Sequence, residues 1–204
     1  ASSVKITMLN DSKIEFNRTI PHEGDVPGKI SCELKGVDLD SGLKVMVTGA
    51  EGRNQLTMKN VIEPLAIESG LTELNLVVDA VVSIGGEDLV VYVVTKDGKI
   101  TNTLSGNKCA SGTGEFFKQQ LLRMNLDLTD INKLDPEGSL CKLSGRCSVF
   151  MKSDCTHKLN KGEAKTEDIV RSLSKVMANK VYEFLSRAKI NSGKFKKELE
   201  KFGE

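Results

Sequence analysis

Two segments of this chain, residues 4–14 and 90–100, align without a gap, and each has the pattern of a β-hairpin. Both have strand-like runs on either side of turn-forming residues, NDS in the first segment and KDG in the second. Four positions are identical: Val4, Asp11, Lys13 and Ile14 recur as Val90, Asp97, Lys99 and Ile100. Repeated hairpins predict antiparallel strand pairs in two related halves, rather than a doubly wound parallel sheet.

The two hairpins differ in what precedes them. The second follows VVSIGGED (81–88), a strand that runs into two glycines, whereas nothing precedes the first, since the chain begins there. If the halves are duplicates, the first half lacks its first strand and its glycine turn. We therefore expect a partial first lobe over residues 1–78, without first strand and phosphate loop, and a second lobe over residues 79–204.

The rest of the chain adds helices and one further strand. LKVMVTG (43–49) is typical of a buried strand, and MKNVIEPLAIESG (58–70) predicts a helix with a break or kink at Pro64. Helical spacing also marks residues 115–124 and 147–159, while residues 127–146 resemble a loop. The clearest helix covers 166–190, with Thr166 as its N-cap. Hairpins alternating with helices favour an α/β protein with mixed sheets.

The composition argues against several classes of partner. The formal net charge is +1, aromatic residues make up 4% and Trp is absent, so neither a basic patch nor a stacking platform for nucleic acid is expected. No segment approaches the roughly 20 apolar residues of a membrane span. The first residues lack the pattern of a signal peptide. We expect a cytoplasmic protein with no nucleic-acid and no membrane partner.

The segment NKCASGTGEFF (107–117) places a thiol and several small residues at the start of a predicted helix. Gly112 and Gly114 allow close backbone approach because they have no Cβ. A helix start has unpaired N–H groups and a partial positive charge, which favour a phosphate, a thiolate such as that of Cys109, or an anionic metal–sulfur cluster. A glycine turn beside a structural cysteine accounts for the pattern equally well.

Two further segments are candidate sites. In SIGGEDLVV (83–91), Gly85 and Gly86 form a turn that is able to wrap a phosphate with backbone amides, although ordinary tight turns have the same pattern. In GRCSVFMKSDC (145–155), Cys147 stands where a second helix begins. Cys109 and Cys147 alone cannot complete a four-thiolate iron–sulfur site. A twofold-symmetric dimer would supply four thiols.

The remaining cysteines and the histidines show no clear pattern of chemistry. The chain has five cysteines and no CxxC pair, which argues against a disulfide framework and against a zinc ribbon. The roles of Cys32, Cys141 and Cys155 stay open. His22 and His157 have no partnered catalytic residue in the sequence pattern.

Taken together, these motifs resemble the BadF/BadG/BcrA/BcrD-type ATPase family, which includes ATP-dependent activators of 2-hydroxyacyl-CoA dehydratases. The matching segments are TGAEGRN (48–54), SIGGED (83–88), NKCASGTGEFF (107–117), GRCSVFMKSD (145–154) and the long helix. The resemblance implies an actin/Hsp70/hexokinase-like (ASKHA, ribonuclease H-like) ATPase fold. It implies that Cys109 and Cys147 ligate a [4Fe–4S] cluster shared across a homodimer. It further implies an ATP/Mg site, whose residues would be Gly85, Gly86, Gly112, Thr113 and Gly114.

The same resemblance implies a function in electron transfer. Family members couple ATP hydrolysis to the transfer of one low-potential electron into a partner dehydratase or reductase. One alternative is a non-catalytic ASKHA-fold domain that serves assembly or regulation within a larger protein. A sugar or acetate kinase of the same fold is disfavoured, because KCASGTG is foreign to those enzymes.

The chain departs from the family pattern at several points. It begins after the position of the family's Asp-x-Gly-Ser/Thr phosphate loop, and NSGKFKKELEKFGE (191–204) replaces a Thr-Gly-Gly motif. Ser83 stands where the family has an acidic residue, and Lys152 stands in place of a glutamate. We therefore expect a fold that is incomplete at both ends, and little or no ATP hydrolysis by this chain alone.

Overall fold

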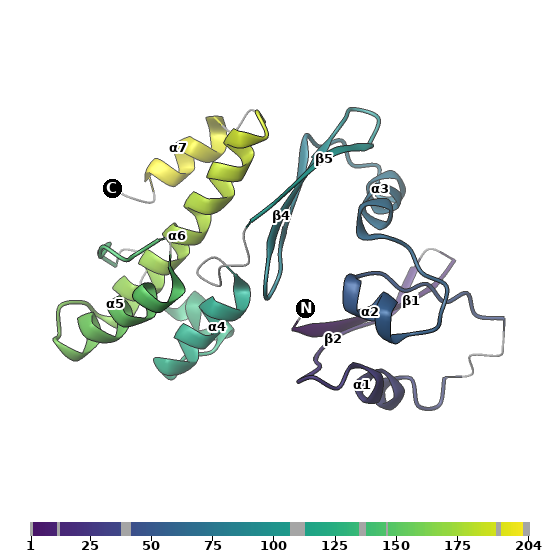
Figure 1. Cartoon of the computed structure of the whole chain (residues 1–204), viewed down its shortest axis with the longest axis horizontal. Helices are drawn as coiled ribbons and strands as arrows, with labels where there is room; N and C mark the ends of the chain where they lie inside the picture. Colours follow the sequence, from purple (N-terminus) through teal and green to yellow (C-terminus); the bar gives the residue numbers. More distant parts are fainter. Residues whose placement is uncertain are drawn as a thin grey trace. The chain divides into compact units, whose positions relative to one another are not determined.

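The computed structural model describes residues 2–11, 13–37, 42–106, 113–134, 138–145, 147–190 and 193–201. The chain divides into two compact units, residues 1–77 and residues 78–204, and each is described by itself. Figure 1 shows that both units combine strands with helices, as the predicted α/β class requires.

The first unit is built on a β-hairpin. Strands β1 (Ser3–Asn10) and β2 (Lys13–Pro21) pair antiparallel, with a register shift between Met8 and Leu9. This confirms the first predicted hairpin. The helices that follow are α1 (Val26–Glu33), α2 (Ala50–Gln55) and α3 (Glu63–Glu73). Helix α1 was not predicted, although Asp25 caps it by accepting the Gly28 amide and a proline occupies its first turn.

Two predictions for the first unit are wrong. Residues 43–49 do not form a strand: Val47 makes only an isolated parallel bridge to Asn60, and Met46 is exposed. A strand requires a neighbouring segment that pairs with its backbone groups along its length. Among the described residues, only those around Asn60 pair with this segment, and they do so at Val47. The helix predicted over residues 58–70 is present as α3 but begins only at Glu63, with Pro64 in its first turn, because that turn tolerates a residue without an N–H group.

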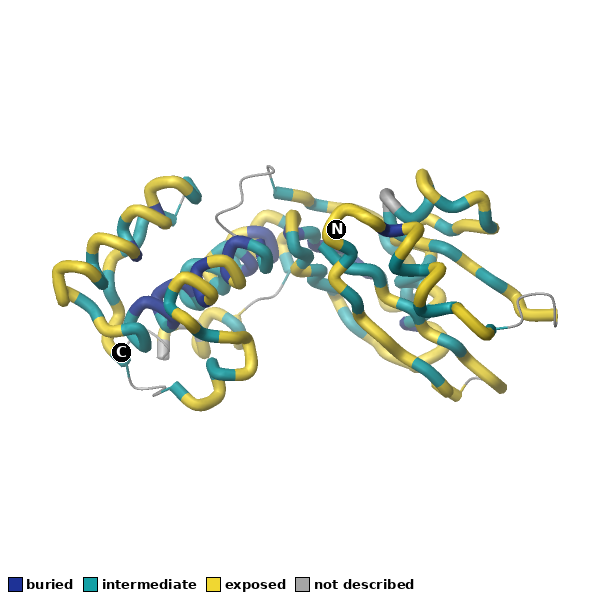
Figure 2. The backbone as a smooth tube through the Cα atoms, turned by 90° about the horizontal axis from the view of Figure 1, so that it is seen from below, coloured by how far each residue is buried: buried dark blue, intermediate teal, exposed yellow. Residues whose placement is uncertain are grey.

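The first unit buries few side chains. Among its described residues, only Val26 and Leu71 are buried. The exposed large apolar side chains of this unit are Leu9, Ile14, Leu43, Met46, Ile62, Leu65, Leu74, Leu76 and Val77. In Figure 2, exposed and half-buried positions predominate along this part of the chain. The described part of this unit therefore has a very small apolar core.

The second unit begins with a three-stranded antiparallel sheet in the order β3-β4-β5. Its strands are β3 (Ala80–Ile84), β4 (Leu89–Val94) and β5 (Ile100–Ser105). The central strand β4 is mostly buried, and Val91 is fully so. This confirms the second predicted hairpin and the strand that leads into the two glycines.

Helices make up the rest of the second unit. They are α4 (Gly114–Arg123), the short 3-10 helix η2 (Leu128–Lys133), α5 (Ser148–Asn160), α6 (Thr166–Arg187) and α7 (Gly193–Lys201). The helices predicted at 115–124, 147–159 and 166–190 are thus confirmed, with small shifts at their ends. The long helix α6 is the most prominent element of this unit in Figure 1. No helix in the described ranges has both the length and the apolar content to cross a membrane.

Two apolar clusters give the second unit its core. The first joins α4, α5 and α6 through Phe116, Phe117, Leu121, Met151, Cys155, Ile169, Val170 and Leu173. The second joins β4 to the later part of α6 through Leu89, Val91, Val181, Phe184 and Leu185. Because α6 contributes to both clusters, it connects the sheet to α4 and α5, the two helices that begin beside predicted site residues.

The start of α6 differs from the prediction in one detail. The N-cap is Lys165, not Thr166, and the carboxylate of Asp168 accepts the Lys165 amide at 2.8 Å. An acidic side chain in the first turn therefore satisfies the amide that precedes the helix, while also suiting its positive end.

Candidate functional site

The clearest local structure among the predicted site residues joins the Gly85–Gly86 turn to the start of α4. The turn connects β3 to β4, and the Gly85 amide closes it by donating to the Asp88 carbonyl at 2.8 Å. The Gly114 amide donates to the Gly85 carbonyl at 2.9 Å, and the Glu115 amide donates to the Gly86 carbonyl at 3.0 Å. The glycine turn and the start of α4, which are separate candidate sites in the sequence, are thus joined by main-chain hydrogen bonds.

Gly114 is glycine because the two backbones approach closely. A Cβ at this position would lie 3.1 Å from the Gly85 carbonyl oxygen and 4.0 Å from the Cα of Gly86. The first distance is shorter than an ordinary van der Waals contact, and the atom that it meets belongs to fixed backbone. Gly114 therefore has a packing role that does not depend on any ligand.

The amides at the start of α4 already have partners. Gly114 and Glu115 donate to the turn carbonyls, and the Phe116 amide donates to the hydroxyl of the N-cap, Thr113, at 3.5 Å. The expectation that this helix start offers unpaired N–H groups is wrong for these three positions. The helix dipole still favours an anion there. Gly112 and Cys109 lie outside the described residues, so the expectations that depend on them stay predictions.

Cys147 lies at the N-cap of α5, where the sequence pattern predicts a helix to begin. Its backbone is extended, and its carbonyl accepts the Met151 amide at 2.9 Å, which forms the first turn of the helix. The thiol is half-buried and is not part of a disulfide. The thiol therefore lies beside the positive end of the helix dipole.

The donor chemistry of Cys147 fits an iron–sulfur ligand. Within the described ranges, no group of three or more His, Cys, Asp or Glu side chains is arranged to hold a metal ion. A cluster shared between two subunits requires only two thiols from each, so it does not need such a group. The second predicted ligand, Cys109, is not among the residues that the structure describes.

The other described cysteines lie in different surroundings. Cys155 is buried among α4, α5 and α6, and this burial raises its pKa to about 12, with smaller contributions from Cys141 and Asp154. It therefore stays a neutral thiol at pH 7 and is a poor metal ligand. Cys141 is half-buried with its sulfur 3.3 Å from the Ser172 hydroxyl, and Cys32 is exposed on α1.

Two apolar side chains in the first turn of α5, close after Cys147, are exposed. Val149 is 70% exposed and Phe150 is 64% exposed, both in the first turn of α5. Exposed apolar groups that lie together are typical of contact surfaces. In the sequence, these residues stand out only as part of a motif. Their exposure follows from the fold, because Met151 and Cys155 form the buried side of α5.

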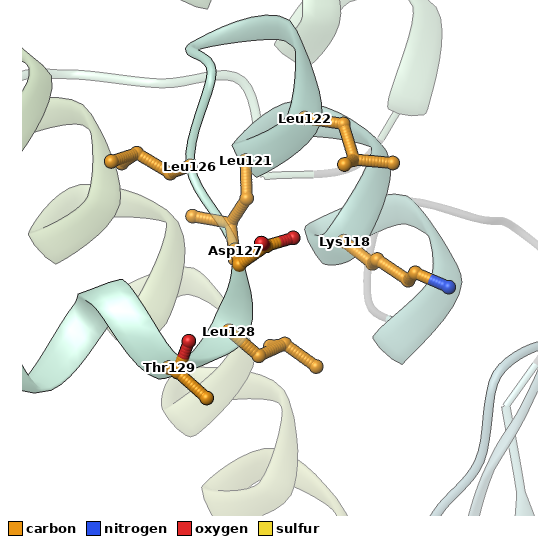
Figure 3. Close-up of a pocket in the computed structure, with 7 residues that line it drawn as sticks. All are labelled: Lys118, Leu121, Leu122, Leu126, Asp127, Leu128 and Thr129. Carbon is orange, nitrogen blue, oxygen red and sulfur yellow. The ribbon is translucent and has the colours of Figure 1, made fainter.

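A shallow cavity of about 280 Å³ lies beside α4 (Figure 3). Its lining residues are Lys118, Leu121, Leu122, Leu126, Asp127, Leu128 and Thr129. None of these is a predicted site residue. The lining is mostly leucine with one cation and one carboxylate, so it lacks the convergent backbone donors of a phosphate site. We assign it no part in nucleotide binding.

Comparison with known proteins identifies relatives of this chain. An uncharacterized protein of Methanocaldococcus jannaschii is 29% identical over 199 residues, which are 94% of this chain and 79% of that protein. The 2-hydroxyisocaproyl-CoA dehydratase activator of Clostridioides difficile is 27% identical over 71% of this chain. The (R)-2-hydroxyglutaryl-CoA dehydratase activating ATPase of Acidaminococcus fermentans is 31% identical over 55% of it. The match spans 54% and 43% of these two activators, about half their length.

Solved structures and a family profile complete the comparison. The activator of 2-hydroxyisocaproyl-CoA dehydratase from Clostridium difficile with bound ADPNP gives a TM-score of 0.81 at 24% identity, over 92% of this chain and 73% of that one. Component A of the Acidaminococcus fermentans (R)-2-hydroxyglutaryl-CoA dehydratase gives 0.77 at 23% identity, over 92% and 75%. The predicted actin/Hsp70/hexokinase-like ATPase fold is confirmed. Because the family profile matches residues 39–196, and the KCASGTG and GRCSVF motifs lie within that range, this chain belongs to the BadF/BadG/BcrA/BcrD ATPase family.

Proposed function

We propose that this protein is an ATP-dependent activator that delivers a low-potential electron to a dehydratase or reductase, such as a 2-hydroxyacyl-CoA dehydratase. The family match over residues 39–196 carries this proposal. The relatives named as dehydratase activators support it, and both cysteine motifs fall inside the matched range. Since the sequence match spans 54% and 43% of those two activators, the proposal concerns the part of the activity that these residues contribute.

The proposed electron carrier is a [4Fe–4S] cluster that Cys109 and Cys147 hold together with the same two residues of a second subunit. The half-buried thiol of Cys147 at the start of α5 supports this assignment. When bound, such a cluster supplies one-electron transfer at a potential that depends on nearby charge, hydrogen bonds and solvent exposure. The exposed side chains of Val149 and Phe150 support a homodimer, because pairing would remove this apolar surface from water.

The proposed nucleotide site is the joint between the Gly85–Gly86 turn and α4, with Gly112, Thr113 and Mg²⁺ completing it. Main-chain hydrogen bonds connect the turn to Gly114 at the start of α4. A nucleotide that displaces the turn would therefore also move the helix start. Cys109 stands four residues before the N-cap of that helix, which provides a route from nucleotide to thiol.

We further propose that residues 1–78 form a partial lobe related to the lobe of residues 79–204. In the second unit, the central strand β4 has a partner on each side. In the first unit, β1 pairs only with β2 among the described strands, and the unit buries little apolar surface. A strand equivalent to β3 on the open edge of β1 would give the two lobes the same arrangement.

Quantification of iron and acid-labile sulfide in anaerobically purified protein, together with its oligomeric mass, tests the electron-carrier proposal. We expect a brown dimer with about four iron atoms per two chains. Cys109→Ser and Cys147→Ser should each abolish the cluster. The matched control is Cys32→Ser, because that thiol is exposed on α1 and should be dispensable. A colourless protein that binds no nucleotide, or a cluster that survives Cys147→Ser, contradicts the proposal.

A further inference from the structure

We infer that Asp154 is a positioning residue that fixes Cys147 at the start of α5 by closing the segment that precedes it. Since Cys147 is a ligand only under the proposed function, this inference rests on that function. It adds a residue outside the thiols and the glycine turns, and it assigns the role of holding one thiol in place to a carboxylate on the same helix.

Asp154 holds both the main chain and the side chain of Ser144. Its Oδ2 accepts the Ser144 amide at 2.8 Å and the Ser144 hydroxyl at 2.6 Å. Ser144 stands three residues before Cys147, and Asp154 stands seven residues after it, about two turns along α5. Residues seven apart lie on the same face of a helix. The two hydrogen bonds therefore tie a residue just before Cys147 to the helix that begins just after it.

The chemistry of the groups makes the contact between Ser144 and Asp154 strong. Hydrogen bonds to a carboxylate are shorter and stronger than those between neutral groups. Ser144 and Asp154 are both half-buried, so water competes less for the same oxygen. On the helix side of Cys147, the Met151 amide donates to the Cys147 carbonyl. Cys147 is thus held between the Ser144 contact and the first turn of α5.

The chain before Ser144 is anchored to α6 in the same manner. Asp168 Oδ1 accepts the Ser139 amide at 2.7 Å, and Ser172 Oγ accepts the Cys141 amide at 2.9 Å. These contacts fix the path of the segment from residue 138 onward. Among the described residues, Asp154 provides the last side-chain anchor before the thiol.

Firm placement matters most for a ligand that is shared across a twofold axis. Four thiolates must converge on one centre, and the ligating side chains need supporting contacts to hold that geometry. Any displacement of Cys147 in one subunit recurs in the other by symmetry, so two of the four ligands move together. A cluster in such a site should be sensitive to the loss of Asp154 even if the fold survives.

The test compares Asp154→Ala, Asp154→Asn and Ser144→Ala with the parent protein, as whole anaerobic chains. Glu163→Gln is the matched control: it removes the same charge from an exposed carboxylate just after α5, where the ion pairs to Lys158 and Lys161 are 3.8 and 3.7 Å. We expect iron release to a chelator to be about tenfold faster in Asp154→Ala, since losing both hydrogen bonds to a charged acceptor shifts a local equilibrium by at least this factor. The two milder variants should fall between, and the control should match the parent.

Amide hydrogen exchange of the apoprotein gives a readout that needs no cluster. In Asp154→Ala, exchange should accelerate at Ser144 and in the first turn of α5, while the amides of α6 keep their protection. Uniformly faster exchange with unchanged iron release would mean that Asp154 only stabilises the fold, and would overturn the positioning role. Parent-like exchange and parent-like iron release would overturn it too.

The two proposals fail in different ways. If the parent binds no cluster, or if Cys147→Ser retains it, the proposed function is wrong, while local exchange at Ser144 still decides whether Asp154 orders this loop. If Cys147→Ser loses the cluster but Asp154→Ala keeps normal iron content and release, the function stands and the positioning role is wrong.

Discussion

Cys147 and Cys155 lie on the same helix, yet their surroundings suit opposite uses. Cys147 is half-buried at the positive end of α5, whereas Cys155 is in the core between α4, α5 and α6. Burial favours the neutral thiol of Cys155. One helix thus begins at an accessible thiol and contains another that behaves as a small apolar group.

At the residue scale, Cys155→Ala should flatten the pH dependence of stability in alkaline solution. Burial raises the pKa of the folded-state thiol to about 12, whereas an unfolded thiol titrates near 9.0. As the pH rises, the unfolded state releases its proton first, so the contribution to stability is complete below about pH 9 and is lost toward pH 12. The loss is at most about 1.4 kcal/mol per pH unit for this group.

Urea unfolding of reduced, cluster-free protein at pH 7, 9 and 10 measures this effect. The control is Cys32→Ala, which removes an exposed thiol and should follow the parent curve. If Cys155→Ala and the parent lose stability in parallel above pH 9, the buried-thiol explanation is wrong.

Also at the residue scale, Gly114→Ala should destabilise the second unit. The added Cβ would lie 3.1 Å from the Gly85 carbonyl, so the start of α4 or the turn must shift. Strain of this kind typically costs about 1–3 kcal/mol. Urea unfolding followed by circular dichroism measures the change in the unfolding free energy.

Gly70→Ala is the matched comparison for Gly114→Ala. Gly70 lies in α3 with no atom within 4 Å of its missing Cβ, so alanine there should stabilise by about 0.5–1 kcal/mol through helix propensity. If both variants shift stability in the same direction, close packing is not the reason for glycine at position 114.

At the scale of elements, the sequence predicted what depends on local patterns. Both hairpins and the helices α4, α5 and α6 follow from alternation or helical spacing within short windows. Residues 43–49 were wrongly assigned because an apolar run does not show whether a neighbouring strand exists to pair with it. The N-cap of α6 was misplaced by one residue: the Asp168 carboxylate accepts the Lys165 amide, Lys165 is the N-cap, and Thr166 is the first residue of the helix.

The candidate site was predictable in its members but not in its connections. The family motifs named Gly85, Gly114 and Cys147 directly. The hydrogen bonds from α4 to the glycine turn join residues 29 positions apart, and the Ser144–Asp154 contact joins a loop to a helix. Such contacts depend on how elements pack, and no local spacing rule encodes them. In the sequence, Lys152 stands out only as a departure from the family motif, and Asp154 only as part of it.

At the scale of the whole molecule, we expect residues 1–77 to exchange their amide hydrogens faster than residues 78–204. The second unit has two apolar clusters along α6, whereas the described part of the first unit buries only Val26 and Leu71. Local opening is easiest where few apolar contacts must be broken. Hydrogen–deuterium exchange with mass spectrometry on the intact chain measures this. Equal protection of β1–β2 and of β4 and α6 would refute the expectation.

The hydrogen bonds that join the β3–β4 turn to Gly114 and Glu115 of α4 run between peptide groups. Every residue type except proline carries the same donor and acceptor, so the bonds do not specify the side chains at positions 86 and 115. The contact does require that position 114 carry no Cβ atom. A connection made of backbone groups can persist while the surrounding side chains change, so relatives with different reactions can keep the same contact between turn and helix.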